Sequence, residues 1–227
     1  MTEPMHESPV NPLPPVVVAL TLMIIVIEGA FSLGARGIMG GAEAVGWRLS
    51  ALQDYAFSGE IFLWMIETGR WPAEHLFRFL SYPFVHASFT HALFAAVMLL
   101  ALGKIVGETL GGVATLLIFV LSGIGGALAF SLLGSPAPLI GAFPPIYGLI
   151  GSFTYLLWVR LGQVGVQQVR AFSLIGVLLL VQLVFGVLFG GSADWVADIA
   201  GFVTGFALAI VLIPGGFARL LAKIRQD

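Results

Sequence analysis

The chain has 227 residues and a net charge of −2; 59% of its residues are hydrophobic and only 10% are charged, and its mean hydropathy is +1.02. A soluble domain carries about 25% charged residues, so an ordinary soluble protein is excluded, and the lack of a basic stripe argues against nucleic-acid binding. Because cysteine is absent, disulfide bonds, thiolate metal ligands and a cysteine nucleophile are excluded as well.

Six apolar stretches approach the roughly 20 residues that a helix needs to cross the hydrocarbon core of a bilayer. A short Pro-rich tail over 1–14 precedes the first stretch, and a basic tail over 215–227 follows the last. We therefore predict an all-α, polytopic membrane protein with one six-helix domain over 15–214. The predicted spans are 15–33, 89–110, 113–133, 139–161, 171–189 and 195–213.

The connection over 34–82 is the long segment between the first two spans, and it is rich in tryptophan, tyrosine and phenylalanine. Aromatic side chains concentrate at membrane–water interfaces, so we predict that this connection is an interfacial loop. Within it, 61–66 is apolar but too short to cross a bilayer, which favours an interfacial or re-entrant helix.

The distribution of lysine and arginine predicts the orientation, because cytoplasmic loops carry an excess of these residues. The links over 104–112 and 160–170 share one side with both termini, and this side holds the basic residues, whereas the opposite short links hold none. We expect both termini to be cytoplasmic, in the inner membrane of a bacterium. The basic residues on this side are Lys104, Arg160, Arg170, Arg219, Lys223 and Arg225.

Two histidines stand where the connection enters the second span. His86 and His91 are five residues apart, and His91 begins a helix that stays apolar until Lys104. A neutral imidazole at this place can donate to an oxyanion. It can equally serve a structural role that joins the loop to the helix, and the residues alone leave both roles open.

Three further segments place unusual residues inside predicted spans. Gly141 and the prolines after it fit a capped, tightly packed helix start, and Gly201 and Gly205 form a GxxxG helix-contact motif. Asp198 either caps the last span or pairs with a buried histidine. Glu28 must pair or face a wet cavity at its depth, although no partner can be named from the sequence.

In this order, the segments over 78–111, 141–151 and 201–205 resemble the rhomboid family of intramembrane serine proteases, over roughly residues 70–213. The resemblance implies a six-helix core with a long, partly embedded loop between the first two helices. His86 and His91 match the family's second-helix signature, and Gly201 and Gly205 match the glycine pair of its sixth helix. Gly141 begins the segment similar to its G-x-S-G region, and Tyr147 matches a tyrosine that packs beneath the catalytic histidine.

The departures from the family pattern concern its chemistry. By the resemblance, the nucleophilic serine falls on Phe143, the general-base histidine on Asp198 and the oxyanion asparagine on Ala95. A phenyl ring has no nucleophilic atom, and Pro144 has no N–H to offer an oxyanion. The resemblance therefore implies a pseudoprotease without cofactor or metal, whose partners are lipid and the transmembrane helices of client proteins.

Three other interpretations stay open at this point. A relocated nucleophile would keep serine endopeptidase activity, with Ser88 or Thr90 beside the histidines, or with Ser81, Ser152 or Thr154. A small transporter or proton path would use Glu28, Asp198 and the histidines, although no internal repeat supports it. A metal site would need both histidines and Asp198, and the five-residue spacing predicts that one histidine points away unless the loop bends.

Overall fold

The structure is a computed structural model that describes residues 12–189 and 193–213. These residues form nine α-helices and three short 3-10 helices, and their only strand-like pairing is an isolated bridge. The helices are α1 Pro15–Ala35, η1 Ala42–Gly46, α2 Trp47–Tyr55, α3 Gly59–Thr68, α4 Ala73–Ser81, η2 Tyr82–Phe84, α5 Phe89–Leu110, α6 Gly112–Ser131, α7 Phe143–Gln163, η3 Gln168–Phe172, α8 Ser173–Phe189 and α9 Asp194–Leu212.

Four helices of the described chain, α1, α5, α6 and α9, are long and apolar enough to cross a membrane. The other two predicted spans correspond to α7 and α8. The α8 helix has 17 residues, and α7 has two prolines directly after its first residue and also carries polar and small residues, which lower its hydropathy. The prediction of an all-helical membrane protein is confirmed, and the count of six spans stays a prediction.

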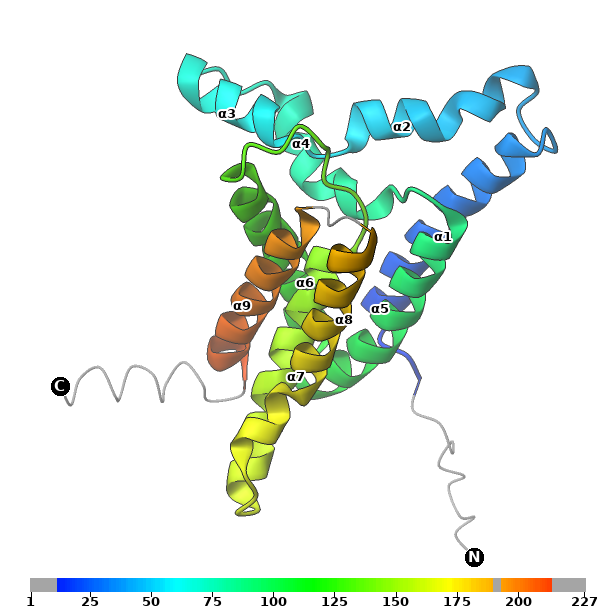
Figure 1. Ribbon diagram of the computed structural model, residues 1–227. Helices are drawn as coiled ribbons and strands as arrows, with labels where there is room; N and C mark the ends of the chain where they lie inside the picture. The colour runs from blue at the N-terminus through cyan, green and yellow to red at the C-terminus, as the bar shows by residue number, and fades with distance from the viewer. Residues whose placement is uncertain (1–11, 190–192, 214–227) are drawn as a thin grey trace, which may run out of the picture.

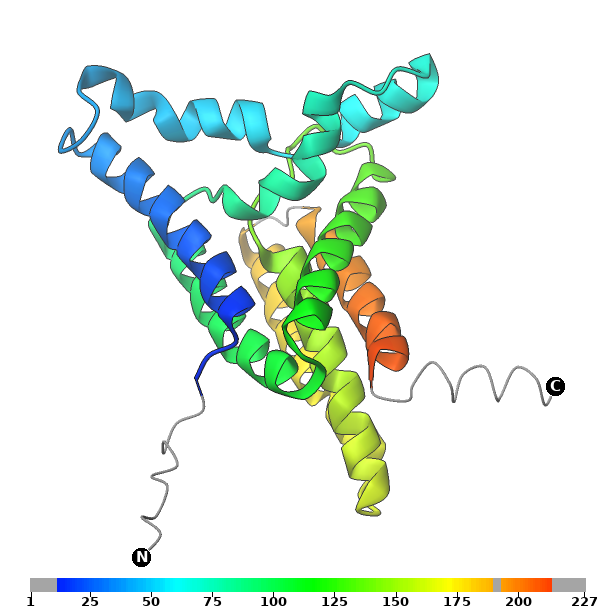
Figure 2. The same ribbon diagram turned by 180° about the vertical axis from the view of Figure 1, so that it is seen from behind.

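The long helices form a bundle with a layer of shorter helices across one end. In Figures 1 and 2, α1 runs beside α5, while α6, α7 and α9 form the other side of the bundle. The helices α2, α3 and α4 lie across the end of this bundle (Figures 1 and 2). The α8 helix makes its main packing contacts with α7 and η3. The predicted tail over 215–227 and most of the tail over 1–14 lie outside the described residues.

Glycines allow α7 and α9 to pack with their backbones in contact. A Cβ atom added to Gly201 would overlap the backbone of Pro144, and one added to Gly205 would overlap the carbonyl group of Gly148. Both glycines are buried on α9. The helix contact predicted from the GxxxG spacing is therefore confirmed, and it places the start of α7 against the first turns of α9.

The helix α7 begins later than the sequence predicted. Leu139 exchanges two backbone hydrogen bonds with Phe57 (3.1 and 2.8 Å), so it is extended rather than helical. Gly141 then turns the chain with a φ of +85°, and its N–H donates to the carbonyl of Tyr82 over 3.0 Å. The predicted span from 139 is thus wrong by four residues, because these backbone groups pair with the connection instead of with each other.

The connection between α1 and α5 is folded and anchored to the bundle. Arg78 donates to the carbonyl of Ala56 (3.1 Å) and Ser81 donates to that of Tyr55 (2.9 Å). The hydroxyl of the fully buried Tyr82 donates to the carbonyl of Gly123 on α6 (2.9 Å). The apolar segment 61–66 lies within α3, so its helical prediction is confirmed, whereas its depth relative to a membrane stays a prediction.

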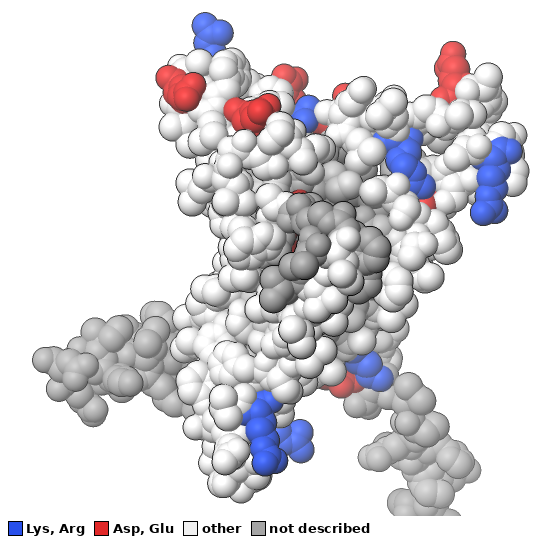
Figure 3. Space-filling model, in the orientation of Figure 1, with Lys and Arg blue, Asp and Glu red and all other residues white. Residues whose placement is uncertain are grey.

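Charged side chains gather at the two ends of the molecule. Figure 3 shows Lys, Arg, Asp and Glu over the layer of short helices and at the opposite end, with an almost uncharged band between. Such a band is expected where side chains face hydrocarbon. Together with the four long apolar helices, it makes this chain an integral membrane protein.

Candidate functional site

The candidate site lies where the loop before α5 meets the start of α7. Ser88 begins α5 as its N-cap, because its Oγ accepts a hydrogen bond from the N–H of His91 (3.2 Å). The chain bends there, so that the rings of His86 and His91 meet edge to face, with centroids 5.0 Å apart and planes at 83°. The bend that the sequence analysis gave as the exception is present, so neither histidine points away from the other.

Phe143 covers one face of His91. The two rings are stacked, with centroids 5.3 Å apart and planes at 14°, and Phe143 is half-buried. Gly141 packs beside the same imidazole, where an added Cβ would lie 2.7 Å from Nε2 of His91. Glycine is needed at 141 both for this close approach and for the positive φ.

His86 is buried in the loop between η2 and α5, with 1% of its surface exposed. Its Nε2 accepts from the N–H of Ala142 over 3.4 Å, which requires an unprotonated nitrogen. Burial lowers the pKa of His86 from 6.5 to about 4, because removing water disfavours the charged form. His86 is therefore neutral near pH 7 and connects the loop to the residue before α7.

Asp198 is joined to α8 rather than to a histidine. It is 3% exposed, and its Oδ2 accepts a hydrogen bond from Nε2 of Gln182 over 2.6 Å. The proposed pairing of Asp198 with a buried histidine is absent from the described residues, whereas its stabilisation by the N-terminal end of α9, about one turn away, stays a prediction. Gln182 is a site residue that the sequence analysis missed.

The remaining family positions lie in the apolar core. Ala95 is fully buried on α5 and belongs to the same core cluster as Tyr147, which is 3% exposed on α7. Phe143 packs against the edge of this cluster. The Ala95 position therefore offers a methyl group, and not a hydrogen-bond donor, to the interior of the site.

Glu28 has a partner that the sequence did not name. Arg48 on α2 binds it with two hydrogen bonds, Nη2 to Oε1 at 2.7 Å and Nη1 to Oε2 at 2.8 Å. Ser32 donates to the same carboxylate over 2.8 Å. Arg48 also donates to the carbonyl of His86 over 2.7 Å. One guanidinium therefore joins α1, α2 and the loop over 85–88 between η2 and α5, which we call the histidine loop.

Most hydroxyl groups considered as alternative nucleophiles bind backbone groups. Ser88 caps α5, Ser81 donates to Tyr55, and Ser152 donates to the carbonyl of Gly205 over 2.8 Å. Thr154 is fully buried. None of these contacts joins a hydroxyl to an imidazole, as activation of a serine requires.

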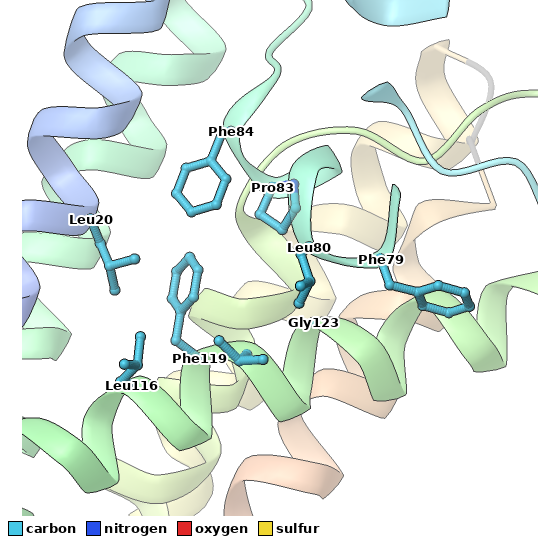
Figure 4. A pocket seen from close by; sticks show the side chains of 9 residues that line it. Leu20, Phe79, Leu80, Pro83, Phe84, Leu116, Phe119 and Gly123 are labelled. Carbon is cyan, nitrogen blue, oxygen red and sulfur yellow. The ribbon is translucent and has the colours of Figure 1, made fainter. Parts of the chain in front are cut away.

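The described residues also include an apolar pocket and lack a metal cluster. Throughout 12–189 and 193–213, no group of three or more His, Asp or Glu residues is arranged to hold a metal ion. The pocket has a volume of about 210 Å³ and lies between α1, the segment from α4 to η2, and α6. In Figure 4 the side chains of Leu20, Phe84 and Phe119 meet around it. With no titratable group in its lining, this pocket can hold an apolar group but can carry out no acid–base chemistry.

The fold and the arrangement of the site define a helical membrane protein in which two histidines, His86 and His91, lie against the start of α7. A family model of the Rhomboid domain matches residues 73–215, well over half of the chain. The chain belongs to the rhomboid family. It is also similar to RHOMBOID-like protein 4 of Arabidopsis thaliana, with 29% identity over 136 residues, which are 60% of this chain and 34% of that relative. The matched part thus spans about a third of the relative's length.

Proposed function

We propose that this rhomboid-family protein is a pseudoprotease that binds the transmembrane helices of client proteins without cutting them. The observation that carries the proposal is the stacking of Phe143 on His91 at 5.3 Å. By the family resemblance, a serine hydroxyl would occupy this position, and nucleophilic catalysis needs such an atom beside a base. Here an aromatic ring covers the imidazole instead.

The neighbouring positions support the same conclusion. Asp198, at the position of the general base, is hydrogen-bonded to Gln182, and residue 143 has no proton for it to remove. Pro144 has no N–H for an oxyanion, and Ala95 replaces the family's asparagine. Four parts of the acyl-transfer machinery are therefore missing together.

Occupied hydroxyl groups argue against an active hydrolase with a relocated nucleophile. Ser88, one of the two hydroxyl residues between the histidines, has its Oγ bound to the N–H of His91. The other, Thr90, is exposed in the first turn of α5. The transporter alternative is weakened by the separate partners of its two acids, since Glu28 binds Arg48 and Asp198 binds Gln182. The pseudoprotease needs neither a relocated nucleophile nor an ion path, so we favour it over both alternatives.

In the proposed membrane arrangement, residues 15–214 form a single domain with six spans, and the connection over 34–82 lies at the membrane interface. We assign α7 and α8 as the two additional spans, because they run through the uncharged band in Figures 1 and 3. Arg160 lies in the last turn of α7 and Arg170 in η3. Their common end of the bundle would face the cytoplasm by the positive-inside rule, in the inner membrane of a bacterium.

A cleavage assay tests the proposal. The purified chain is reconstituted in liposomes with a generic rhomboid substrate, beside an active rhomboid protease as the positive control. We expect no cleavage by the chain and complete cleavage by the control. Cleavage that survives purification and is lost in Ser88→Ala would instead establish the relocated nucleophile.

A further inference from the structure

One carboxylate oxygen of Asp198 lacks a hydrogen-bond partner among the described residues, although it is buried inside the helix bundle. Its Oδ2 binds Gln182, but its Oδ1 is buried and has no hydrogen-bond partner among the described residues. The amide oxygen Oε1 of Gln182 is also buried and unpartnered within the same part of the chain. A buried polar group without a partner costs about 1–3 kcal/mol, and more when it is charged, so two adjacent acceptors indicate an unfilled site.

The surroundings of Asp198 supply no cation. Within the described ranges, no lysine, arginine or histidine forms an ion pair with Asp198. Tyr82 and Tyr147 lie close enough to interact electrostatically with it, but the hydroxyl of Tyr82 already donates to Gly123. Asp194 also interacts electrostatically with Asp198, so the described surroundings add negative charge and supply no basic side chain.

The packing of α8 gives a route to this pair of acceptors. Gln182 comes from α8, which packs mainly on α7 and η3, whereas Asp198 comes from α9, which packs tightly on α6 and α7 through its glycines. The outer surface of α8 is apolar, and Val177, Leu180 and Leu188 are each more than half exposed. A second helix in the membrane can therefore pack on α8, the helix that carries Gln182, while the α6–α7–α9 core stays intact.

We propose that Asp198 and Gln182 form a recognition site for a basic side chain, Lys or Arg, carried within the apolar span of a client helix. This inference rests on the proposed function and names the class of client. A basic residue inside a membrane needs an acidic or polar partner, and an ammonium or guanidinium group has several N–H donors and no acceptor. Such a group would donate to Oδ1 of Asp198 and Oε1 of Gln182 and would neutralise the buried carboxylate.

The test measures binding of synthetic transmembrane peptides to the full chain in liposomes by fluorescence energy transfer. The host peptide is a Leu/Ala helix whose central residue is Lys, Gln or Leu. We expect the Lys peptide to bind at least about tenfold more tightly than the Leu peptide, which corresponds to about 1.4 kcal/mol. Asp198→Asn should abolish this difference, and Asp54→Asn, which changes an exposed residue of α2 in the same way, should preserve it.

Two further variants show whether a loss of binding in Asp198→Asn comes from misfolding. Asp198→Glu keeps the carboxylate and should retain the preference for the Lys peptide, whereas Gln182→Leu removes one of the two acceptors and should weaken that preference. Equal binding of the Lys and Leu peptides, or tighter binding of the Gln peptide, overturns the basic-client inference but leaves client binding intact. Failure of all three peptides to bind contradicts the proposed function itself. Selectivity for Lys that survives in Asp198→Asn shows that the site lies elsewhere.

Discussion

Phe143 lies parallel to His91, with ring centroids 5.3 Å apart and planes inclined by 14°. The stack fills the space on one face of His91 at the start of α7, and Gly141 packs beside the same imidazole. At position 143, where the family resemblance implies a nucleophilic serine, an aromatic ring therefore lies against an imidazole.

Restoring both reactive groups should restore reactivity toward a serine-directed probe. Phe143→Ser combined with Asp198→His supplies a hydroxyl and a base on helices that pack against each other. We expect labelling of this double variant by a fluorophosphonate probe and no labelling of the unmodified chain. Phe143→Ala with Asp198→His is the matched control, and labelling of that control would show that the probe reacts at another residue.

Breaking the contact between Glu28 and Arg48 should destabilise the protein and loosen the histidine loop. Arg48→Met leaves the carboxylate of Glu28, which is 4% exposed, without its cation, so we expect a loss of about 2 to 4 kcal/mol in the free energy of unfolding. The measurement is thermal or denaturant unfolding in detergent micelles. Glu43→Gln, at an exposed residue of η1, should have no measurable effect.

A double-mutant cycle separates the direct contact from general damage. Glu28→Gln with Arg48→Met should cost less than the sum of the two single changes, because each single change already removes the same interaction. Additive losses would contradict the direct contact between the two side chains.

Adding a methyl group at the contact of α7 and α9 should disrupt the core. The Cβ of Gly205→Ala would overlap the carbonyl group of Gly148, and backbone cannot move aside as a flexible side chain can, so we expect a loss of about 3 kcal/mol or more. Gly176→Ala, on the exposed side of α8 where an added Cβ meets no atom within 4 Å, should change the stability by about 1 kcal/mol or less. Similar unfolding midpoints for the two variants would contradict the close approach of the helices.

Stability should fall in mild acid because of His86. Its pKa in the folded protein is about 4, below the ordinary value of 6.5, so the unfolded chain binds more protons between these two pH values. This contribution is fully present above pH 6.5 and is lost as the pH falls toward 4, by up to about 3 kcal/mol. Unfolding midpoints measured from pH 7.5 to 4 should show a shallower decrease in His86→Asn; an unchanged slope would assign the effect to other groups.

Local sequence patterns predicted the features that depend on nearby residues. The second predicted span coincides with α5, Phe89–Leu110, because an apolar run and a serine cap specify a helix locally. The GxxxG spacing likewise identified the face of α9 that contacts α7. The start of α7 was misplaced because the apolar residue Leu139 pairs with Phe57, which is far away in the sequence.

The partners of the buried charges could not be predicted, because they depend on tertiary structure. Glu28 and Arg48 are separated by 20 residues and a change of chain direction, and several other arginines of the connection were equally plausible. Gln182 did carry a signal that was overlooked, since it is a lone polar side chain in the apolar helix α8. Its side chain provides the hydrogen-bond donor to Oδ2 of Asp198.

One photocrosslinking experiment tests whether the site around Phe143 holds a client helix and leaves it uncut. Benzoyl-phenylalanine replaces Phe143, or Val113 on α6 as an exposed control (77% exposed), and mass spectrometry identifies the peptide that is captured from liposomes. We expect position 143 to capture the transmembrane peptide at full length and far more often than position 113. Equal capture at both positions, or capture of a peptide truncated within its span, would contradict it.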